Sequence, residues 1–272
     1  MGGVYLLIGI GLTLIFGVIK VINFAHGSFM MIAMYVTLWL FNRFDINPYL
    51  SVLINIPLIF VIGYLVQRFL INPILDAPHL NQLLLTLGLL LVIENTMLYF
   101  KGADPYTMKI GYSVQSIKAG GIILSIPRLI ILSVALLYAG LLHLFLSKTE
   151  TGRAIRATAS DRQAALSVGI NVRLMYALAF AIGSTCVGVA GALIMMFFYV
   201  HPYVGHTFLI LAFVIVILGG LGSFFGAFVA GLLIGVIDTF GATFLPGTSG
   251  RMLIFGAMIV VLLFKPTGLF KR

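Results

Sequence analysis

The chain has 272 residues, of which 61% are hydrophobic and 8% charged, and its formal net charge is +9. A mean hydropathy of +1.18 excludes a soluble globular domain and predicts a polytopic membrane protein, built as one integral membrane domain over residues 1–272. The basic residues are scattered between apolar runs and form no stripe, which indicates topology signals and argues against nucleic-acid binding.

Apolar segments follow one another along the whole chain. A helix that crosses a bilayer needs about 20 apolar residues. Nine segments stand out: residues 2–19, 27–41, 50–66, 82–100, 129–146, 174–199, 207–221, 224–245 and 251–264. The seventh and ninth are the shortest, and short segments at membrane depth indicate a pathway, because irregular backbone is tolerated there only beside protein or a cavity. The expected fold is an all-α, polytopic transmembrane helical bundle of about 8–10 membrane segments, some short or broken.

The first interruption, Lys20–Gly27, separates two apolar segments by only a few residues. It is too short for an ordinary loop, and Asn23 and His26 carry groups that can satisfy exposed helix ends. Asn23 and His26 are therefore candidates for lining a transport pathway. The alternative is a tight cytoplasmic turn.

Glu94 and Asp238 are the acidic residues that fall within apolar runs. A charge in the hydrocarbon costs about 2.5–3.5 kcal/mol on insertion scales, so each is a functional candidate by default, and Glu94 joins the pathway candidates. Two acids in separate spans, with no lysine or arginine beside them, make a poor ion relay. This favours packing or hydrogen bonding between helices, with Asn95 as a candidate to share the hydrogen bonds of Glu94.

Residues 101–127 form the longest external loop, and the alternating stretch Ile110–Ile126 fits either a small hairpin or a re-entrant helix. Small residues also recur at four-residue spacing in the apolar segments. They are Gly9, Thr13 and Gly17; Ser184, Gly188 and Ala192; Gly222, Gly226 and Ala230; and Ala227, Gly231 and Gly235. Such stripes let helices approach closely in lipid. They serve packing within the bundle or, alternatively, a subunit interface or sliding surface.

One long polar island, Leu146–Asn171, interrupts the apolar sequence, and with Arg173 it holds five of the sixteen basic residues. If all nine segments cross the membrane, the loops on its side carry ten lysines and arginines, and those on the other side carry six. Positive residues favour the cytoplasm, so the island and the C-terminus are expected inside and the N-terminus outside.

The island is expected to contain two short helices. Ser147–Glu150 and Ser160–Gln163 match capping boxes and predict helices near residues 151–159 and 161–168, with Gly169 as a left-handed terminator. A short capped helix between two spans cannot bury its own face, so it is expected to dock on a partner. The alternative is a solvated connector.

The sequence offers no recognisable reaction chemistry. Cys186 is the single cysteine, which excludes an intrachain disulfide. The histidines lack metal-ligand spacing, and His201 and His206 are expected to tether a loop. Neither a nucleophile–base grouping nor a GxxxxGK[ST] loop occurs. The chain is therefore expected not to be an enzyme and to bind no metal, ATP or other cofactor itself.

Several motifs lie in order over nearly the whole chain. They are GLTLIFG at residues 11–17, VINFAHG at 21–27, TLGL at 86–89, EN at 94–95, TGRAIR at 151–156, GIN at 169–171, VILGGLGS at 216–223 and KPTGLF at 265–270. Together they resemble the branched-chain amino acid ABC transporter permeases. The NFAHG form is most similar to the H-type subunit of the leucine, isoleucine and valine importer.

The resemblance implies a permease in the cytoplasmic (inner) membrane of a prokaryote. Such a permease pairs with a second, related permease, two ATPases that hold ATP and Mg bind inside, and an extracytoplasmic binding protein delivers substrate. The loop 147–173 would carry the coupling helix. Its implied ATPase contacts are Thr151, Gly152, Arg153, Arg156, Asp161, Arg162, Ala165 and Gly169.

The implied function is ATP-driven import of branched-chain amino acids, or of related amino acids or amides. The alternative is an ion-coupled secondary transporter or channel that uses Glu94 and Asp238.

Overall fold

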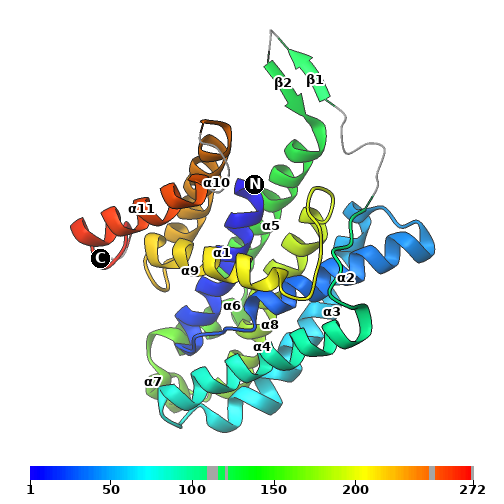
Figure 1. Cartoon of the computed structure of the whole chain (residues 1–272). Helices are drawn as coiled ribbons and strands as arrows, with labels where there is room; N and C mark the ends of the chain where they lie inside the picture. The colour runs from blue at the N-terminus through cyan, green and yellow to red at the C-terminus, as the bar shows by residue number, and fades with distance from the viewer. Residues whose placement is uncertain (109–115, 120–121, 245–248, 271–272) are drawn as a thin grey trace.

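The structure is a computed structural model that describes residues 1–108, 116–119, 122–244 and 249–270, and nearly all of this is helical (Figure 1). The helices are α1 (Gly2–Ile19), α2 (His26–Phe44), α3 (Pro48–Val66), α4 (His79–Lys101), α5 (Ile126–Lys148), α6 (Glu150–Ser160), α7 (Arg162–Ser167), α8 (Val172–Ile194), α9 (Val204–Gly219), α10 (Phe224–Phe244) and α11 (Ser249–Phe264). Short helical turns, Gln67–Ile71 and Asn72–Ile74, continue α3. All nine predicted apolar segments are helices, so the expected helical bundle is confirmed.

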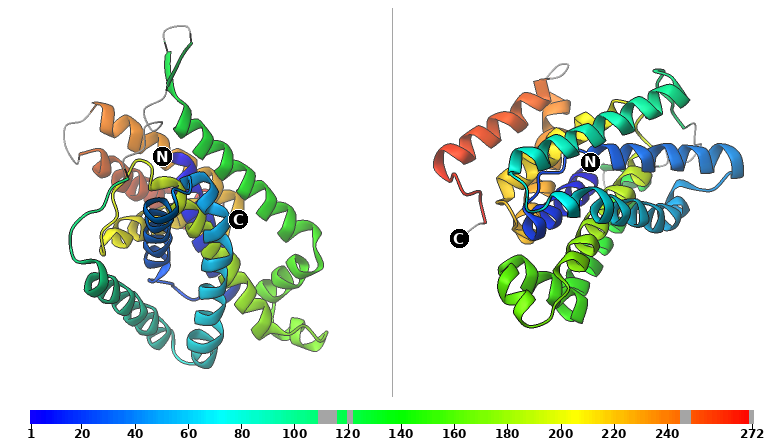
Figure 2. Two further views of the ribbon diagram at one scale, coloured as in Figure 1. Left: turned by 90° about the vertical axis from the view of Figure 1, so that its right-hand side faces the viewer. Right: turned by 90° about the horizontal axis from the view of Figure 1, so that it is seen from below.

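Helices α1 and α8 form the centre of the bundle (Figures 1 and 2). Helix α8 packs against α1, α2 and α3, and α1 also packs against α5, α9 and α10. Both central helices are apolar all round and are buried over nearly their whole length, as expected for a helix surrounded by other helices. Helices α3, α4, α5, α10 and α11 lie farther out and expose large apolar side chains, which is the surface a membrane protein presents to lipid or to partners.

Small residues bring the central helices together. A Cβ atom built on Gly183 of α8 would lie 2.6 Å from Ile15 Cγ1 and 2.7 Å from the carbonyl oxygen of Gly11, both in α1. A Cβ atom on Gly231 of α10 would lie 2.5 Å from Leu6 Cα. Interhelical contacts this close are possible only where side chains are small. A Cβ atom on Gly188 of α8 would lie 3.1 Å from Ile59 Cβ in α3, so the predicted stripes that contain Gly188 and Gly231 serve packing within the bundle.

A two-stranded antiparallel sheet lies before α5. Strand β1 (Ser116–Ala119) pairs with β2 (Ile122–Ser125), with Ser116 opposite Ser125 and Ala119 opposite Ile122. Of the two conformations expected for Ile110–Ile126, the hairpin is confirmed for the strands, while residues 110–115 and 120–121 lie outside the described part of the chain.

Within the described residues, six helices are long and apolar enough to cross a membrane: α1, α3 with its extension, α4, α5, α8 and α10. Helix α9 and the apolar part of α11, Arg251–Phe264, are shorter. The prediction that the seventh and ninth segments are the shortest is thus confirmed. The chain is a multi-pass membrane protein.

Candidate functional site

The interruption Lys20–Gly27 between α1 and α2, called the break from here on, folds back into the bundle. Helix α1 ends at Ile19, the next residue, Lys20, turns the chain with a φ of 59°, and α2 begins at His26. The imidazole Nε2 of His26 lies 3.2 Å from the carbonyl oxygen of Ile8, in the middle of α1. The side chains of Asn23 and His26 are fully buried, and Asn23 Oδ1 accepts a hydrogen bond from the amide of Ala25 at 3.1 Å. The segment is therefore not a tight turn outside the bundle, although Asn23 does satisfy a helix start as expected.

Helices α2 and α9 begin in contact with each other. A Cβ atom built on Gly205, the second residue of α9, would lie 2.8 Å from the carbonyl carbon of Gly27 and 3.1 Å from the amide nitrogen of Ser28. Only glycine at both positions allows the two backbones to approach this closely. Since helix N-termini carry unpaired amides and a partial positive charge, two such ends meet inside the protein.

Glu94 of α4 reaches the first turn of α9. Its side chain is almost fully buried, and both of its carboxylate oxygens lie 3.0 Å from Nε2 of His206. The imidazole of His206 is about half exposed. Asn95 instead donates to the carbonyl of Leu91 in its own helix at 2.8 Å, so the expectation that it shares the hydrogen bonds of Glu94 was wrong.

The two histidines near α9 have different roles. The expectation of a loop tether is confirmed for His201, whose Nδ1 accepts from the amide of Tyr203 at 3.3 Å. It is wrong for His206, which joins two helices.

Helix α4 contacts the rest of the chain mainly through a polar stripe, since its buried residues are Gln82, Thr86, Leu90 and Glu94. The amide of Gln82 donates to the carbonyls of Leu75 and Ala77 at 2.9 and 3.0 Å. The hydroxyl of Thr86 donates to the carbonyl of Ile22, in the break, at 2.9 Å. One face of α4 therefore bonds to the break and to α9.

The second intramembrane acid has a different partner. Tyr5 of α1 donates a hydrogen bond from its hydroxyl to Asp238 Oδ2 of α10 at 2.8 Å. Glu94 and Asp238 thus each bond to a side chain on another helix, which confirms the expectation of hydrogen bonding between helices.

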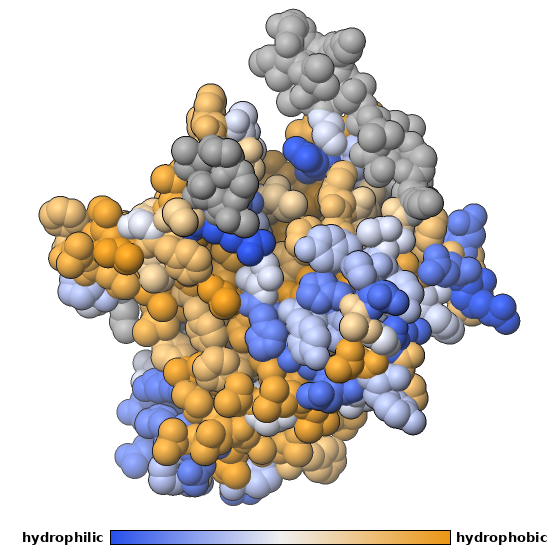
Figure 3. All heavy atoms as spheres, in the orientation of Figure 1, coloured by the Kyte–Doolittle hydropathy of each residue, from blue (hydrophilic) through white to orange (hydrophobic). Residues whose placement is uncertain are grey.

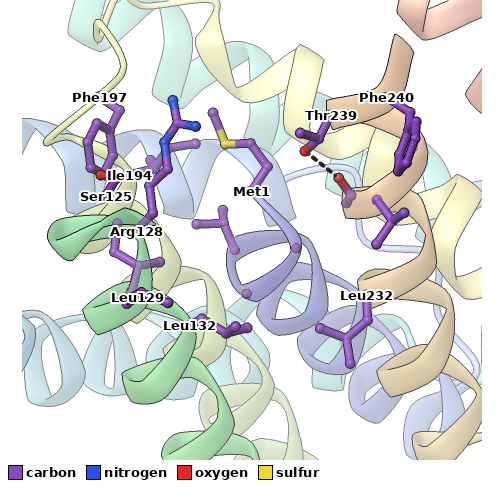
Figure 4. Close-up of a pocket in the computed structure, with 16 residues that line it drawn as sticks. Met1, Ser125, Arg128, Leu129, Leu132, Ile194, Phe197, Leu232, Thr239 and Phe240 are labelled. Carbon is purple, nitrogen blue, oxygen red and sulfur yellow. Dashed lines mark hydrogen bonds between the residues drawn. The ribbon is translucent and has the colours of Figure 1, made fainter. Parts of the chain in front are cut away.

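A pocket of about 680 Å³ lies around the first turn of α1, between α5, α8 and α10 (Figure 4). Its walls are mostly apolar, and the guanidinium carbon of Arg128 lies 5.8 Å from the centre of the Phe197 ring. None of the predicted site residues lines this pocket.

The polar island forms α6 and α7, each one residue different at either end from its predicted range. The capping residues were predicted wrongly. Thr149 caps α6 by accepting from the amide of Gly152 at 3.0 Å, and Asp161 caps α7 by accepting from the amides of Gln163 and Ala164. Ser147 and Ser160 lie within the preceding helices, where their own amides are already bonded. Gly169 follows α7 with a φ of 82°, as expected for a left-handed terminator.

The two island helices differ in what they bury. Helix α6 packs on α1, α5 and α8 and fully buries Ile155, so the expectation that it cannot bury its own face was wrong. Helix α7 buries Ala165, while Leu166 and Val168 are 53% and 74% exposed. The apolar surface open to a partner therefore lies at α7 and the residue that follows it.

An ion pair anchors α7 to the segment before α4. Arg162 Nη1 lies 2.7 Å from Asp76 Oδ1. The hydrogen bond from Arg162, and then its charge, hold the pKa of Asp76 below its usual value, and the same bond raises the pKa of Arg162. Arg153 and Arg156 remain at the surface, with Arg153 3.9 Å from Glu150 and Arg156 bonded to the carbonyl of Ser147 at 3.3 Å.

Comparison with known proteins decides the family. Residues 1–263 match the family described as branched-chain amino acid transport system, permease component. The chain belongs to this family. The whole chain is 33% identical to the high-affinity branched-chain amino acid transport system permease protein BraD of Pseudomonas aeruginosa, of which it covers 93%.

Other curated permeases agree with this assignment. The chain is 29% identical to the permease LivH of Escherichia coli K12, of which it covers 92%, and 29% identical over 97% of its length to a probable LivH of Methanocaldococcus jannaschii, of which it covers 87%. No solved structure matches.

In this permease the predicted residues fall into two separate groups. Asn23, His26 and Glu94 lie around the starts of α2 and α9, and the predicted coupling residues lie in α6 and α7. Sequence reasoning missed His206 and Thr86 as members of the first group. Both are polar residues in or beside apolar helices, and this is the signal that could have identified them.

Proposed function

We propose that this permease translocates branched-chain amino acids, or related amino acids or amides, across the cytoplasmic membrane of a prokaryote. The energy comes from ATP hydrolysis in two partner ATPases that hold ATP and Mg, while the chain itself catalyses no reaction and binds no cofactor. A second, related permease and an extracytoplasmic binding protein complete the importer. The names of the relatives support the cargo, since they are branched-chain amino acid permeases.

The structure of α6 and α7 carries the proposal for the ATPases. The two capped helices stand together at one end of the bundle, with α6 packed on the central helices α1 and α8 (Figure 1). Arg153 and Arg156 lie on the surface of α6, and Leu166 is exposed on α7. Together these side chains offer an ATPase both charged and apolar contacts. Because α6 packs on α1 and α8, a movement of the bound ATPase that displaces α6 is transmitted to these central helices.

The proposed topology follows from the same element. If the ATPases bind α6 and α7, then the loop 147–173 and the C-terminus lie in the cytoplasm and the N-terminus lies outside. The ion-coupled alternative has less support, because Glu94 and Asp238 are both engaged in hydrogen bonds between helices.

Reconstitution tests the function as a whole. The permease is placed in liposomes with its partner permease and ATPases, and uptake of radioactive L-leucine is measured with the binding protein outside and ATP inside. We expect uptake only when all components and ATP are present. Leucine accumulation by this permease alone under a proton or sodium gradient would instead establish the ion-coupled alternative.

Charge reversal tests the docking surface. The double variant R153E/R156E should leave the bundle intact, because Arg153 contacts Glu150 in its own helix and Arg156 makes a single exposed hydrogen bond, to the carbonyl of Ser147 at the end of α5. Reversing charges at an interface removes attraction and adds repulsion, so recovery of ATPase with the tagged permease should fall by about tenfold or more. Arg43→Glu, in the last turn of α2, is the matched control and should leave recovery unchanged. If R153E/R156E recovers as much ATPase as Arg43→Glu and the wild type do, docking at α6 is contradicted.

A further inference from the structure

We propose that Glu94 and His206, together with the meeting starts of α2 and α9, bind the charged groups of a zwitterionic amino acid as it passes through the permease. Glu94 takes the ammonium group, and His206 and the two helix starts take the carboxylate. This site rests on the proposed function, because it specifies how that cargo would be recognised.

Two helix N-termini in contact create a place for an anion. Each brings unpaired amides and a partial positive charge, and here Gly27 and Gly205 place them against each other next to the middle of α1. In transporters, half-helices that begin at membrane depth bind anionic substrate groups in this way. The partial charges repel each other unless a negative group lies nearby, and Glu94 is the acid that bonds to this turn.

Unpaired polar atoms at the same place support a ligand. The side-chain amide nitrogen of Asn23, in the break, and the hydroxyl of Ser28, in the first turn of α2, are buried and have no hydrogen-bond partner within the described chain. Leaving a buried polar group unpaired costs about 1–3 kcal/mol, so two of them at the start of α2 indicate that their bonds are completed by a ligand. Asn23 and Ser28 offer donors for a carboxylate, and Glu94 offers an acceptor for an ammonium group.

The half-exposed His206 lies at one end of a stripe that follows the outer face of α9. Along this helix His206 and Ile210 are exposed and Phe213 and Ile217 are half-buried, while the remaining residues apart from half-buried Thr207 are buried. These four residues recur every three or four positions, so they form one stripe. Phe24 of the break packs on Phe213 with ring centres 5.6 Å apart. A branched aliphatic side chain would find apolar contacts along this stripe while its charged end is held at His206.

A pocket lies beyond the far end of the stripe. It has a volume of about 800 Å³ and is lined by the end of α1, the break, the first turns of α4, and Leu221 and Gly222 after α9. This volume is in the range of small-molecule sites. Figure 1 shows α9 and α4 on the face turned to the viewer, and Figure 3 shows hydrophilic residues gathered on that face among hydrophobic ones. The stripe thus runs from the Glu94–His206 pair toward a pocket.

When no cargo is bound, Glu94 and His206 satisfy each other, which stabilises the empty site. Each group provides the counter-charge or hydrogen bond that the other lacks, so the buried carboxylate is not left alone. A zwitterion brings both charges and can exchange partners with the pair, its ammonium bonding to Glu94 and its carboxylate to His206. A cargo that lacks either charge would leave one of the two groups unpaired, which makes the site selective for the zwitterion.

The test compares L-leucine with 4-methylpentanoate, which is leucine without the ammonium group. Binding to the purified permease–ATPase complex, without binding protein, is measured by saturation-transfer NMR. Glu94→Gln keeps the shape and a hydrogen bond to His206 but removes the charge. We expect it to weaken leucine binding by about tenfold or more and to remove most of the preference for leucine over 4-methylpentanoate. His206→Gln, at a half-exposed position, should weaken the binding of both compounds.

Asp238→Asn is the matched control, because it changes the other intramembrane acid, which bonds to Tyr5. It should leave leucine binding and the preference unchanged. An unaltered preference in the Glu94→Gln complex would overturn the proposal, as would unchanged binding of both compounds to the His206→Gln complex. Absence of leucine binding to a wild-type complex that transports leucine would also overturn it. A wild-type importer that transports no leucine at all would instead contradict the proposed function.

Discussion

Helices α8 and α4 have the same length and nearly the same hydropathy, yet they occupy opposite environments. Each has 23 residues, and their most apolar stretches have mean hydropathies of 2.0 and 1.9. In α8, 89% of that stretch is buried inside the protein, whereas in α4 only 17% is. Hydropathy alone therefore shows that a helix suits the membrane but does not show where in the bundle it lies.

The difference lies in side-chain size and in the kind of bond each helix makes. Helix α8 is rich in glycine, alanine, serine and threonine, and these small residues let α1, α2 and α3 approach it from several sides. Helix α4 is rich in leucine and reaches its neighbours mainly through Gln82, Thr86 and Glu94. Close packing thus holds α8 at the centre of the bundle, while a few hydrogen bonds hold α4 at its edge. We expect α4 to shift during transport with less repacking than α8 would need.

Glycine substitutions test this comparison with the largest expected effect. Gly183→Leu in α8 inserts a side chain where even a Cβ atom would lie 2.6 Å from Ile15 and 2.7 Å from the Gly11 carbonyl. Overpacking a core costs about 1–3 kcal/mol, and more where backbone must move. We expect severalfold lower recovery of monodisperse protein by size-exclusion chromatography in detergent.

The control for this substitution is Gly88→Leu in α4, where nothing lies within 4 Å of the added Cβ atom. Its recovery should equal that of the wild type. A similar loss in both variants would show that α4 is packed as tightly as α8 and would remove the basis of the comparison.

The sequence predicts the helices well because hydrophobic periodicity and length are local properties. All nine apolar segments, the two island helices and Gly169 as a terminator follow from short-range rules. The capping residues were misassigned because Thr149 and Asp161, one or two residues on, compete with Ser147 and Ser160 for the same role. The choice between them depends on where the preceding helix ends, and a pattern of residue types does not determine that.

Removing one hydrogen bond from α4 tests how this helix is held. Thr86→Val keeps the side-chain shape but deletes the bond to the Ile22 carbonyl, which is worth about 0.5–1.5 kcal/mol. We expect faster amide hydrogen exchange in the first half of α4 and in the break, with α8 unchanged.

Thr96→Val is the matched control, because within the described residues Thr96 bonds to the carbonyl of Val92 in its own helix and to no other helix. It should leave exchange in the break unaltered. If Thr86→Val also has no effect there, then apolar packing, and not the polar stripe, holds α4 in place.

The candidate site was only half predictable from the sequence. Asn23, His26 and Glu94 were identified because polar groups at membrane depth are conspicuous. Their arrangement depends on the chain folding back at Lys20, so that α2 starts beside the middle of α1, and on α9 starting at Gly205 against Gly27. Contacts between residues more than one hundred positions apart, such as Glu94 with His206, come from tertiary packing and leave no local pattern.

The smallest expected effect concerns the ion pair that joins the island to the segment before α4. Asp76→Asn removes the charge that faces Arg162, and both groups are largely exposed, so solvent already weakens the pair. We expect amide exchange in α7 to rise by no more than about fivefold, while α4 and the core remain unchanged. Glu150→Gln is the control, since its carboxylate lies 3.9 Å from Arg153 on the same short helix, and it should have no effect on α7.

The pH dependence of the same contact follows from the direction of the shift. The bond from Arg162 lowers the pKa of Asp76 below 3.8, so the stabilisation is complete above pH 3.8 and is lost only as the pH falls through the lowered value. Wild-type α7 should therefore keep the same protection from about pH 8 to about pH 5, once the intrinsic exchange rate is corrected for. A loss of protection within that range would show that a group other than Asp76 holds α7 to the bundle. The island would then be attached to α4 less directly than the structure indicates.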